Sequence, residues 1–334
     1  MFMDPEPHRR QEIQLTLWNA DAPRKHDFIP SGFLSVDAAM QIGGLPRGHM
    51  VELFGPESSG KSTIALQAIA AAQRAGCQAV YVDAERGFDA AYAARLGVDL
   101  GSLLFIQPEG GEQAFRILLK LVQSGTVDLV VIDSLAALSS DSNDPFVHSG
   151  LCASFLRRLS TALTRSNCCL LMLNQLRSRV IEIGNGPEET TTGGWSVKLY
   201  ASIRADIRTV EILQRRGKPF GQRMKMKIVK NRLSPGFKEA QLVMTFGEGF
   251  SPQLDLLSHG LAEELIEQDG DDLIYGGLLL GSTMEEAAAY LKQRPRLEDS
   301  LRNLLHQVMG LPSRKPVVHE AAPVVERVMS ALVG

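Results

Sequence analysis

The sequence predicts an α/β protein with a mostly parallel central sheet flanked by helices, followed by a small C-terminal α/β domain. Three observations predict this class. A glycine-rich phosphate-binding motif lies between a short apolar run and a helix-forming run. Further short apolar runs alternate with helix-forming segments, as in a parallel sheet with crossover helices. From residue 252 onward the composition shifts to acidic, helix-forming segments.

The motif GPESSGKST fits the phosphate-loop pattern G-x-x-x-x-G-K-[ST]. The apolar segment Met50–Phe54 precedes it and the helix-forming run Ile64–Arg74 follows it. Backbone N–H groups of such a loop and the helix N-terminus bind phosphate oxygens, and Lys61 is expected to reach the β and γ phosphates. Ser62 is expected to ligate Mg²⁺. The predicted nucleotide-binding residues of the loop are Gly55, Pro56, Glu57, Ser58, Ser59, Gly60, Lys61, Ser62 and Thr63.

Length and composition set the broad class of the protein. The chain has 334 residues, more than one core usually supports, so a large domain and a small one are expected. With 44% apolar and 22% charged residues and no apolar run long enough to span a membrane, a soluble globular protein is expected. The polar N-terminal stretch MFMDPEPHRRQEI lacks the apolar core of an export signal, which predicts a cytoplasmic protein. No cysteine has a metal-ligand spacing, so buried reduced thiols and no zinc are expected for Cys77, Cys152, Cys168 and Cys169.

Charge is distributed unevenly along the chain. The formal net charge is 35 − 38 = −3, which argues against indiscriminate nucleic-acid binding. The segment Ile203–Lys238, however, has eleven basic and two acidic residues, a local balance of +9. Ser251–Gly310 has four basic and eleven acidic residues, a balance of −7. The basic middle segment is therefore the expected place for a polyanion.

Strand and helix patterns alternate through the first half. QEIQLTLW near the N-terminus alternates like a strand, and Pro23 and Pro30 mark a linker. The other predicted elements of this half are a helix over Val36–Ile42, a strand over Gly76–Ala84, a helix over Ala90–Leu96, a strand over Leu103–Ile106, a helix over Gly111–Ser124 and a strand over Leu129–Ser134.

The second half begins with a polar stretch at Leu135–Gly150. Its other predicted elements are a helix over Leu151–Arg165, a strand ending at Gln175, a long connection over Leu176–Gly194, strands over Trp195–Phe246, and helices over Gly260–Glu267 and Met284–Lys292 with a turn at Asp269–Gly281 between them.

Polar residues stand at or just after the ends of three of these predicted strands. Glu85 comes after the strand Gly76–Ala84, Asp133 ends the apolar run LVVID, and Gln175 ends CCLLMLNQ. In parallel α/β sheets the carboxyl ends of the strands meet at the ligand-binding edge. A carboxylate after four apolar residues also fits the second Mg²⁺-binding position of phosphate-loop NTPases, which predicts that role for Asp133.

The chain resembles the bacterial RecA recombinases from about Ser31 to Gly310. The stretches that carry the resemblance are GPESSGKST, YVDAERGFD, VVIDSLAAL, NQLR, PEETTTGG, KLYASIRADIR and KIVKNR. The resemblance implies a phosphate-loop ATPase core over residues 31–250 and a small C-terminal domain over 251–310. Residues 1–30 are expected to form an N-terminal segment for docking or partner binding, and 311–334 a tail.

The resemblance also implies roles for particular residues. Glu85 orients the attacking water, Asp133 supports Mg²⁺, and Gln175 senses the γ phosphate of ATP. Tyr92 packs near adenine, with Asp89 close by.

In the family a neighbouring subunit completes the active site. Lys230 and Arg232 stand where two basic residues reach across to the phosphates, and the second is usually lysine. Arginine keeps the charge and can bind phosphate with two donors, so the contact is expected to survive. A solvated strand face is the alternative for these two residues.

Two loops carry DNA contacts in the family, and by position they are Ser140–Gly150 and Leu176–Gly194. Basic groups and backbone N–H donors suffice to hold a single strand without sequence preference. The predicted DNA-binding residues are Arg177, Arg179, Thr192, Gly193 and Gly194.

The N-terminal segment leaves two functions open. QLTLW resembles the motif by which bacterial repair proteins bind the replication sliding clamp, with Gln14, Leu15, Leu17 and Trp18 as anchors. The favoured function is an ATP-dependent recombinase that assembles on single-stranded DNA and pairs it with duplex. The alternative is a non-filamentous RecA paralogue of the ImuA type, a clamp-associated subunit of a translesion mutasome. A subunit-docking strand or an idle tail are the other interpretations of the segment.

Overall fold

The computed structural model describes residues 27–138, 145–179, 188–191, 194–235 and 238–312. Its helices are α1 (Leu34–Met40), α2 (Lys61–Arg74), α3 (Ala90–Arg95), α4 (Gly111–Ser124), α5 (Pro145–Ser166), α6 (Gly194–Tyr200), α7 (Pro252–Ala262), α8 (Met284–Lys292) and α9 (Pro295–Val308), with a 3-10 helix at Leu135–Leu138. Within these ranges no helix is both long and apolar enough to cross a membrane.

The strands form one large sheet and two small ones. They are β1 (Phe28–Ile29), β2 (Leu45–Pro46), β3 (Met50–Gly55), β4 (Ala79–Asp83), β5 (Leu104–Ile106), β6 (Leu129–Asp133), β7 (Cys169–Arg179), β8 (Glu188–Thr191), β9 (Ile203–Arg215), β10 (Lys218–Asn231), β11 (Glu239–Thr245), β12 (Gly249–Phe250), β13 (Glu267–Asp269), β14 (Asp272–Tyr275) and β15 (Leu278–Gly281). The central sheet has the order β12-β11-β10-β9-β3-β7-β6-β4-β5, and β8 pairs with β7.

The central sheet is mixed, and its parallel part was predicted. β3 pairs in parallel with both β7 and β9, and the β7-β6-β4-β5 side is parallel throughout. From β9 to β12 the pairing is antiparallel. The α/β class is therefore confirmed, with an antiparallel extension on the basic side of the chain.

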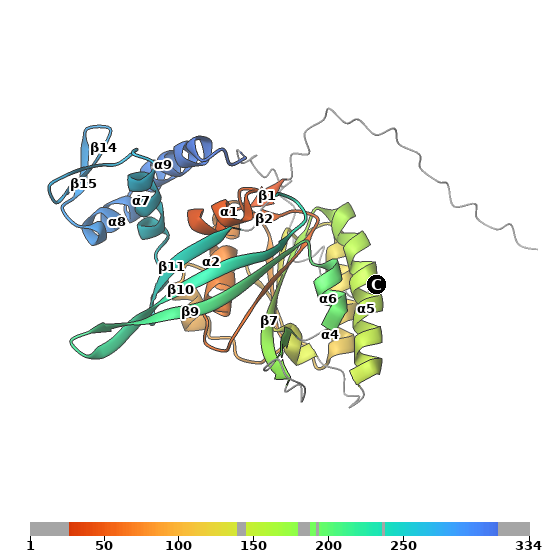
Figure 1. Cartoon of the computed structure of the whole chain (residues 1–334). Coiled ribbons are helices and arrows are strands. Elements are labelled where there is room, and N and C mark those ends of the chain that lie inside the picture. The colour runs from red at the N-terminus through yellow and green to blue at the C-terminus, as the bar shows by residue number, and fades with distance from the viewer. Residues whose placement is uncertain (1–26, 139–144, 180–187, 192–193, 236–237, 313–334) are drawn as a thin grey trace, which may run out of the picture.

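Successive residues of the parallel strands point to opposite faces, so each strand contributes to two cores. Val51 and Leu53 lie in the core under α1 and α2, whereas Met50 lies in the core under α4, α5 and α6. Tyr81 and Val82 of β4 divide between the two cores in the same way. Figure 1 shows α4, α5 and α6 gathered on one side of the sheet. Burial on both faces explains why these strands read as continuous apolar runs.

Three predictions for the second half were wrong. α5 begins at Pro145, six residues before the predicted start, because proline suits the first helical position. β7 continues past Gln175 to Arg179 and pairs with β8, so the predicted unstructured connection has strands at both ends. Gly194–Tyr200 is a helix, with Val197 fully buried, where strand alternation was predicted.

The C-terminal part also differs from the prediction. A three-stranded antiparallel sheet, β13-β14-β15, occupies the predicted turn, and α7 ends at Ala262. The sequence there has short strands joined by Gly270 and by Gly276-Gly277, all at positive φ, which is typical of tight turns. These elements share an apolar cluster with α7, α8, α9 and Leu34 of α1. The domain boundaries given above stay a prediction.

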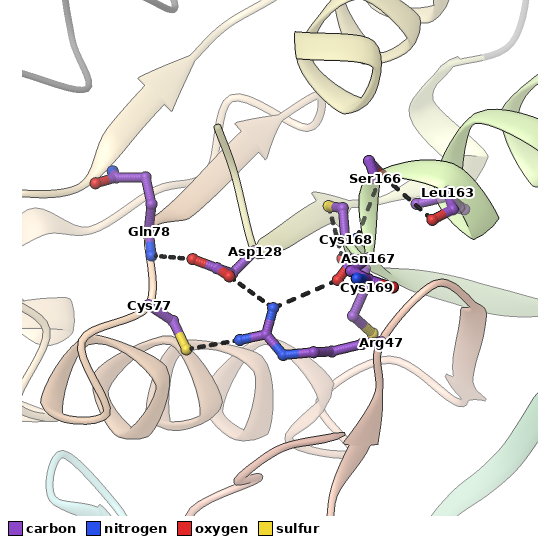
Figure 2. A network of polar contacts seen from close by, with 9 residues as sticks. All are labelled: Arg47, Cys77, Gln78, Asp128, Leu163, Ser166, Asn167, Cys168 and Cys169. Atoms are coloured by element: carbon purple, nitrogen blue, oxygen red, sulfur yellow. Dashed lines mark hydrogen bonds and ion pairs between the residues drawn. The ribbon is translucent and has the colours of Figure 1, made fainter. Parts of the chain in front are cut away.

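A polar network around Arg47 joins three segments on the amino-end side of the parallel strands (Figure 2). The Arg47 guanidinium donates to the Asp128 carboxylate at 2.6 Å and to the Cys77 sulfur at 3.3 Å. The other carboxylate oxygen of Asp128 accepts from the backbone N–H of Gln78 at 2.7 Å. Both ion-pair side chains are nearly buried, at 12% and 7% exposure. This network fixes the entry to β3 against the starts of β4 and β6.

The cysteines beside this network are buried thiols, as predicted for Cys77, Cys168 and Cys169. Burial raises the pKa of the Cys168 thiol and raises that of Cys169 to about 12. Both sulfurs are therefore protonated and unreactive near neutral pH. The side chain of Cys152 lies outside the described residues.

Arg47→Met is expected to lower the free energy of unfolding by about 3 kcal/mol or more, since a buried carboxylate loses its cation. Arg116→Met is the matched control, because the Arg116–Glu112 pair is 70% and 83% exposed. That substitution is expected to cost less than about 1 kcal/mol. Urea unfolding measures both values, and equal costs would show that the Arg47 pair does not organise the fold.

Candidate active site

The phosphate loop forms a tight turn between β3 and α2. Gly60 at the start of α2 has a φ of 80°, and Ser58 has a φ of 57°. A Cβ atom at Gly55 would collide with the backbone carbonyl of Ile207 on β9, and one at Gly60 would lie 2.9 Å from the end of Met224. Close packing therefore favours glycine at positions 55 and 60, and the positive φ of Gly60 favours glycine there as well.

Lys61 is held inside this loop. Its ammonium donates to the carbonyl oxygens of Gly55 and Pro56, at 3.1 and 2.6 Å, and to the Ser59 hydroxyl at 3.3 Å. Burial lowers the pKa of Lys61, while Asp133 and Glu85 oppose the shift. A cation enclosed by the loop's own oxygens can exchange them for the more strongly accepting oxygens of a polyphosphate.

Ser62 and Asp133, the two predicted Mg²⁺ ligands, meet beside the loop, and their metal role stays a prediction. The Ser62 side chain hydrogen-bonds the Asp133 carboxylate, and the Tyr81 hydroxyl donates to the same carboxylate at 2.6 Å. Burial raises the pKa of Asp133, and these two hydrogen bonds oppose it. The Ser62 hydroxyl in the first turn of α2 and the Asp133 carboxylate at the end of β6 are hard oxygen ligands, which suit Mg²⁺. The residues present therefore fit the expected metal.

Glu85 lies between two hydrogen-bond donors. The Ser134 hydroxyl donates to one of its carboxylate oxygens, and the Gln175 amide donates to the same oxygen at 3.0 Å. β4, β6 and β7 are parallel neighbours, so their carboxyl ends bring these three residues together. The predicted meeting of Glu85 and Gln175 at one sheet edge is thus found, whereas Ser134 was not assigned a role.

Asp83 is a buried polar residue that the sequence did not identify. Its carboxylate accepts from the backbone N–H groups of Gly87 and Phe88, at 3.1 and 3.2 Å, and from the Gln107 amide at 3.0 Å. These bonds fix the turn that carries Glu85. The sequence signal that could have identified Asp83 is its position at the end of the apolar strand, in YVDAE.

Asp89 and Tyr92 are placed by α3. The Asp89 side chain caps the helix by accepting from the Tyr92 backbone N–H at 2.9 Å. The Tyr92 hydroxyl lies 3.0 Å from that of Thr63 in the phosphate-loop helix. Tyr92 therefore borders the loop, and its predicted contact with adenine stays a prediction.

Lys230 and Arg232 lie at the end of β10. The Lys230 ammonium donates to the carbonyl oxygens of Lys198 and Leu199, at 2.6 and 3.0 Å, at the carboxyl end of α6. Partial burial lowers the pKa of Lys230 to about 8, and the charges of Arg232 and Arg204 add to the shift. Arg232 itself is exposed. Both cations are thus presented next to the helix that follows the second predicted DNA loop.

A buried ion pair that was not anticipated joins β3 to the second loop. Glu52 is fully buried and pairs with Arg204 on β9. The Asn174 amide donates to Glu52 at 2.8 Å, and Arg204 donates to the Thr191 hydroxyl on β8 at 3.4 Å. The pair therefore ties the phosphate-loop strand to the residue before Gln175 and to the returning strand β8.

The predicted DNA-binding residues are only partly described. In backbone register Arg177 faces Thr190 and Arg179 faces Glu188, on β7 and β8. The side chains of Arg177 and Arg179 lie outside the described residues, as do Thr192 and Gly193, while Gly194 begins α6. Of the first predicted loop, 145–150 belongs to α5, which corrects that boundary, and 140–144 lies outside the described residues. Gln14, Leu15, Leu17 and Trp18 also lie outside the described residues.

Comparison with known proteins identifies the family. The family model of the RecA N-terminal domain matches residues 14–251. "Protein RecA" of Kineococcus radiotolerans is 42% identical over 296 residues, covering 86% of this chain and 85% of the relative. "Protein RecA" of Methylobacterium sp. (strain 4-46) is 39% identical over 320 residues (93% and 88%), and that of Geobacter sulfurreducens is 41% identical over 296 (86% and 87%).

These relatives favour the recombinase interpretation over the mutasome alternative, and they lend no support to a sliding-clamp partner. The match of the family model over more than half of the chain, with identities near 40% over most of it, is sufficient to assign the family. This chain therefore belongs to the RecA family of DNA recombination and repair proteins.

Proposed function

We propose that this protein is an ATP-dependent recombinase that binds single-stranded DNA, pairs it with duplex DNA and hydrolyses ATP at interfaces between protomers. The observation that supports this proposal most directly is the position of Glu85. Its carboxylate accepts a hydrogen bond from the Gln175 amide at 3.0 Å beside the phosphate loop. Gln175 lies on β7, and the same strand runs on to Arg179 at the second predicted DNA loop. β7 thus connects Gln175, the hydrogen-bond partner of Glu85, to the segment that is predicted to bind DNA.

The residues divide the chemistry among themselves. Loop N–H groups and Lys61 bind the phosphates, and Ser62 and Asp133 hold the metal. Bound Mg²⁺ supplies charge neutralisation on the phosphate oxygens. The Glu85 carboxylate orients the attacking water by accepting its hydrogen bond, while Ser134 fixes the direction of the carboxylate. When ATP is bound, the Gln175 amide donates its hydrogen bond to the γ phosphate in place of Glu85. This change of acceptor shifts the start of the second predicted DNA loop.

Self-association completes the site in this proposal. Lys230 and Arg232 of one protomer contact the phosphates held by its neighbour, and their positive charges stabilise the charge that develops during transfer. The basic segment from β9 to β10 and the second loop supply phosphate contacts to DNA.

The direct test of the function is a strand-pairing assay with single-stranded DNA, homologous duplex and ATP. Homology-dependent joint molecules and an ATPase rate that rises with single-stranded DNA are expected. An ATPase that ignores DNA, together with no pairing, would contradict the proposal.

Glu85→Gln is expected to leave ATP binding within about threefold of wild type and to slow hydrolysis by about a hundredfold or more, since only the water-orienting acceptor is lost. Lys61→Ala serves as the contrast, because it removes the cation at the phosphates and should impair binding itself. Binding of a fluorescent ATP analogue and single-turnover hydrolysis separate the two effects. Equal losses of binding in both variants would remove Glu85 from its assigned role.

Replacing Lys230 or Arg232 by Ala is expected to lower the DNA-stimulated ATPase rate about tenfold or more, while dilute protomers bind nucleotide normally. Mixing each variant with an excess of Glu85→Gln protein tests the sharing of sites. Activity should rise above that of either protein alone, because the Glu85→Gln protomers supply the missing cation in trans. No gain on mixing would argue against a shared site.

The same site has a pH signature. Because the pKa of Lys230 in the protomer is lowered to about 8, its charge is present below that pH and is lost as pH rises through it. A phosphate contact favours the charged form, so the DNA-stimulated rate should decline at or above pH 8. Lys230→Arg keeps its positive charge over this whole pH range, so the decline of the rate at or above pH 8 should be smaller in this variant.

A further inference from the structure

The hairpin of β9 and β10 forms one wall of the phosphate loop. The Ile207 carbonyl of β9 lies against Gly55, where the loop begins. Met224 of β10 lies against Gly60, where the loop ends. Between these two contacts, the Gln222 amide of β10 donates to the backbone carbonyl of Ser58 at 3.1 Å. One hairpin therefore contacts the start, the middle and the end of the loop.

Gln222 is placed to act on the loop backbone. Its side chain is 5% exposed, and its amide oxygen accepts from the Thr209 hydroxyl at 3.3 Å. Thr209 stands on the neighbouring strand, so both ends of the Gln222 amide are engaged. Both polar ends of the buried amide are thus satisfied, and the end that donates is the one that contacts the loop.

The backbone that Gln222 contacts is in an unfavourable conformation. Ser58 has a φ of 57°, in the left-handed region that residues with a Cβ rarely adopt. Such a conformation persists when its surroundings hold it there. In a planar trans peptide the C=O of one residue and the N–H of the next point in opposite directions. A Ser58 carbonyl directed at Gln222 therefore directs the Ser59 N–H away from the hairpin.

We propose that Gln222 is a positioning residue for nucleotide binding, which holds the phosphate loop so that its N–H groups are directed at phosphate oxygens. This role rests on the nucleotide binding proposed above. It makes the β9–β10 hairpin a part of the nucleotide-binding site. Gln222 acts through Ser58. The hairpin therefore contributes to phosphate affinity before any DNA is bound.

The test compares Gln222→Met with Thr209→Val in the full-length protein without DNA. Methionine keeps the length and most of the volume of glutamine but donates no hydrogen bond, so the Ser58 carbonyl loses its partner. Valine at 209 removes the other bond of Gln222 and leaves the Ser58 contact in place. The readouts are the affinity for a fluorescent ADP derivative, the hydrogen exchange of peptides covering residues 55–62, and the melting temperature.

For Gln222→Met we expect ADP affinity to fall about three- to tenfold, which corresponds to the loss of one buried hydrogen bond. Hydrogen exchange in residues 55–62 should rise. Steady-state ATPase should show a raised KM with kcat within about twofold of wild type. Thr209→Val should bind ADP within about twofold of wild type, with unchanged exchange in the loop.

Two outcomes would overturn the role. One is wild-type ADP affinity and loop exchange in Gln222→Met. The other is a large fall in its melting temperature with faster exchange across the whole core, which indicates a structural contribution. Wild-type protein that fails to bind ADP contradicts the proposed function itself, and this result is separate from any difference between the two variants.

Discussion

The hydrogen bond from the Gln175 amide to the Glu85 carboxylate is the contact on which the proposed coupling depends. Glu85 follows β4, where Asp83 fixes the turn, and Gln175 lies on β7 before that strand passes into the second predicted DNA loop. A hydrogen bond from an amide to an ionised acceptor is stronger than one to a neutral acceptor. In the proposed function, a γ phosphate of ATP competes with Glu85 for the same donor, which would give β7 two alternative arrangements at Gln175. Two such states are what coupling between distant sites requires.

The sheet explains why this contact forms. β3, β4, β6 and β7 are parallel neighbours, so their carboxyl ends lie at one edge and carry the phosphate loop, Glu85, Asp133 and Gln175. The opposite ends are tied by the Arg47 network (Figure 2). The fully buried Glu52 and its partner Arg204 cross-link β3 and β9. Buried pairs of this kind fix the relative positions of the strands more than they add to stability.

Sequence reasoning predicted the parts of the fold that depend on local pattern. The strand, loop and helix of the phosphate site have a fixed spacing, and strands buried on both faces give unbroken apolar runs. The missed features depend on residues far apart in the chain. Gln222 meets Ser58 across 164 positions, Tyr81 meets Asp133 across 52, and Arg204 meets Glu52 across 152. The helix α6 has the apolar residues Trp195 and Leu199 exposed, so its apolar positions do not mark its buried side in the sequence.

The most direct test of the coupling is its reciprocity. Affinity for single-stranded DNA is measured with and without a non-hydrolysable ATP analogue, and affinity for the analogue with and without DNA. The two enhancement factors are expected to be equal, since coupling between binding sites acts in both directions. In Gln175→Ala both factors should fall toward one, with analogue affinity in the absence of DNA nearly unchanged. DNA affinity that is independent of nucleotide in the wild-type protein, or full enhancement in Gln175→Ala, would contradict the role of β7.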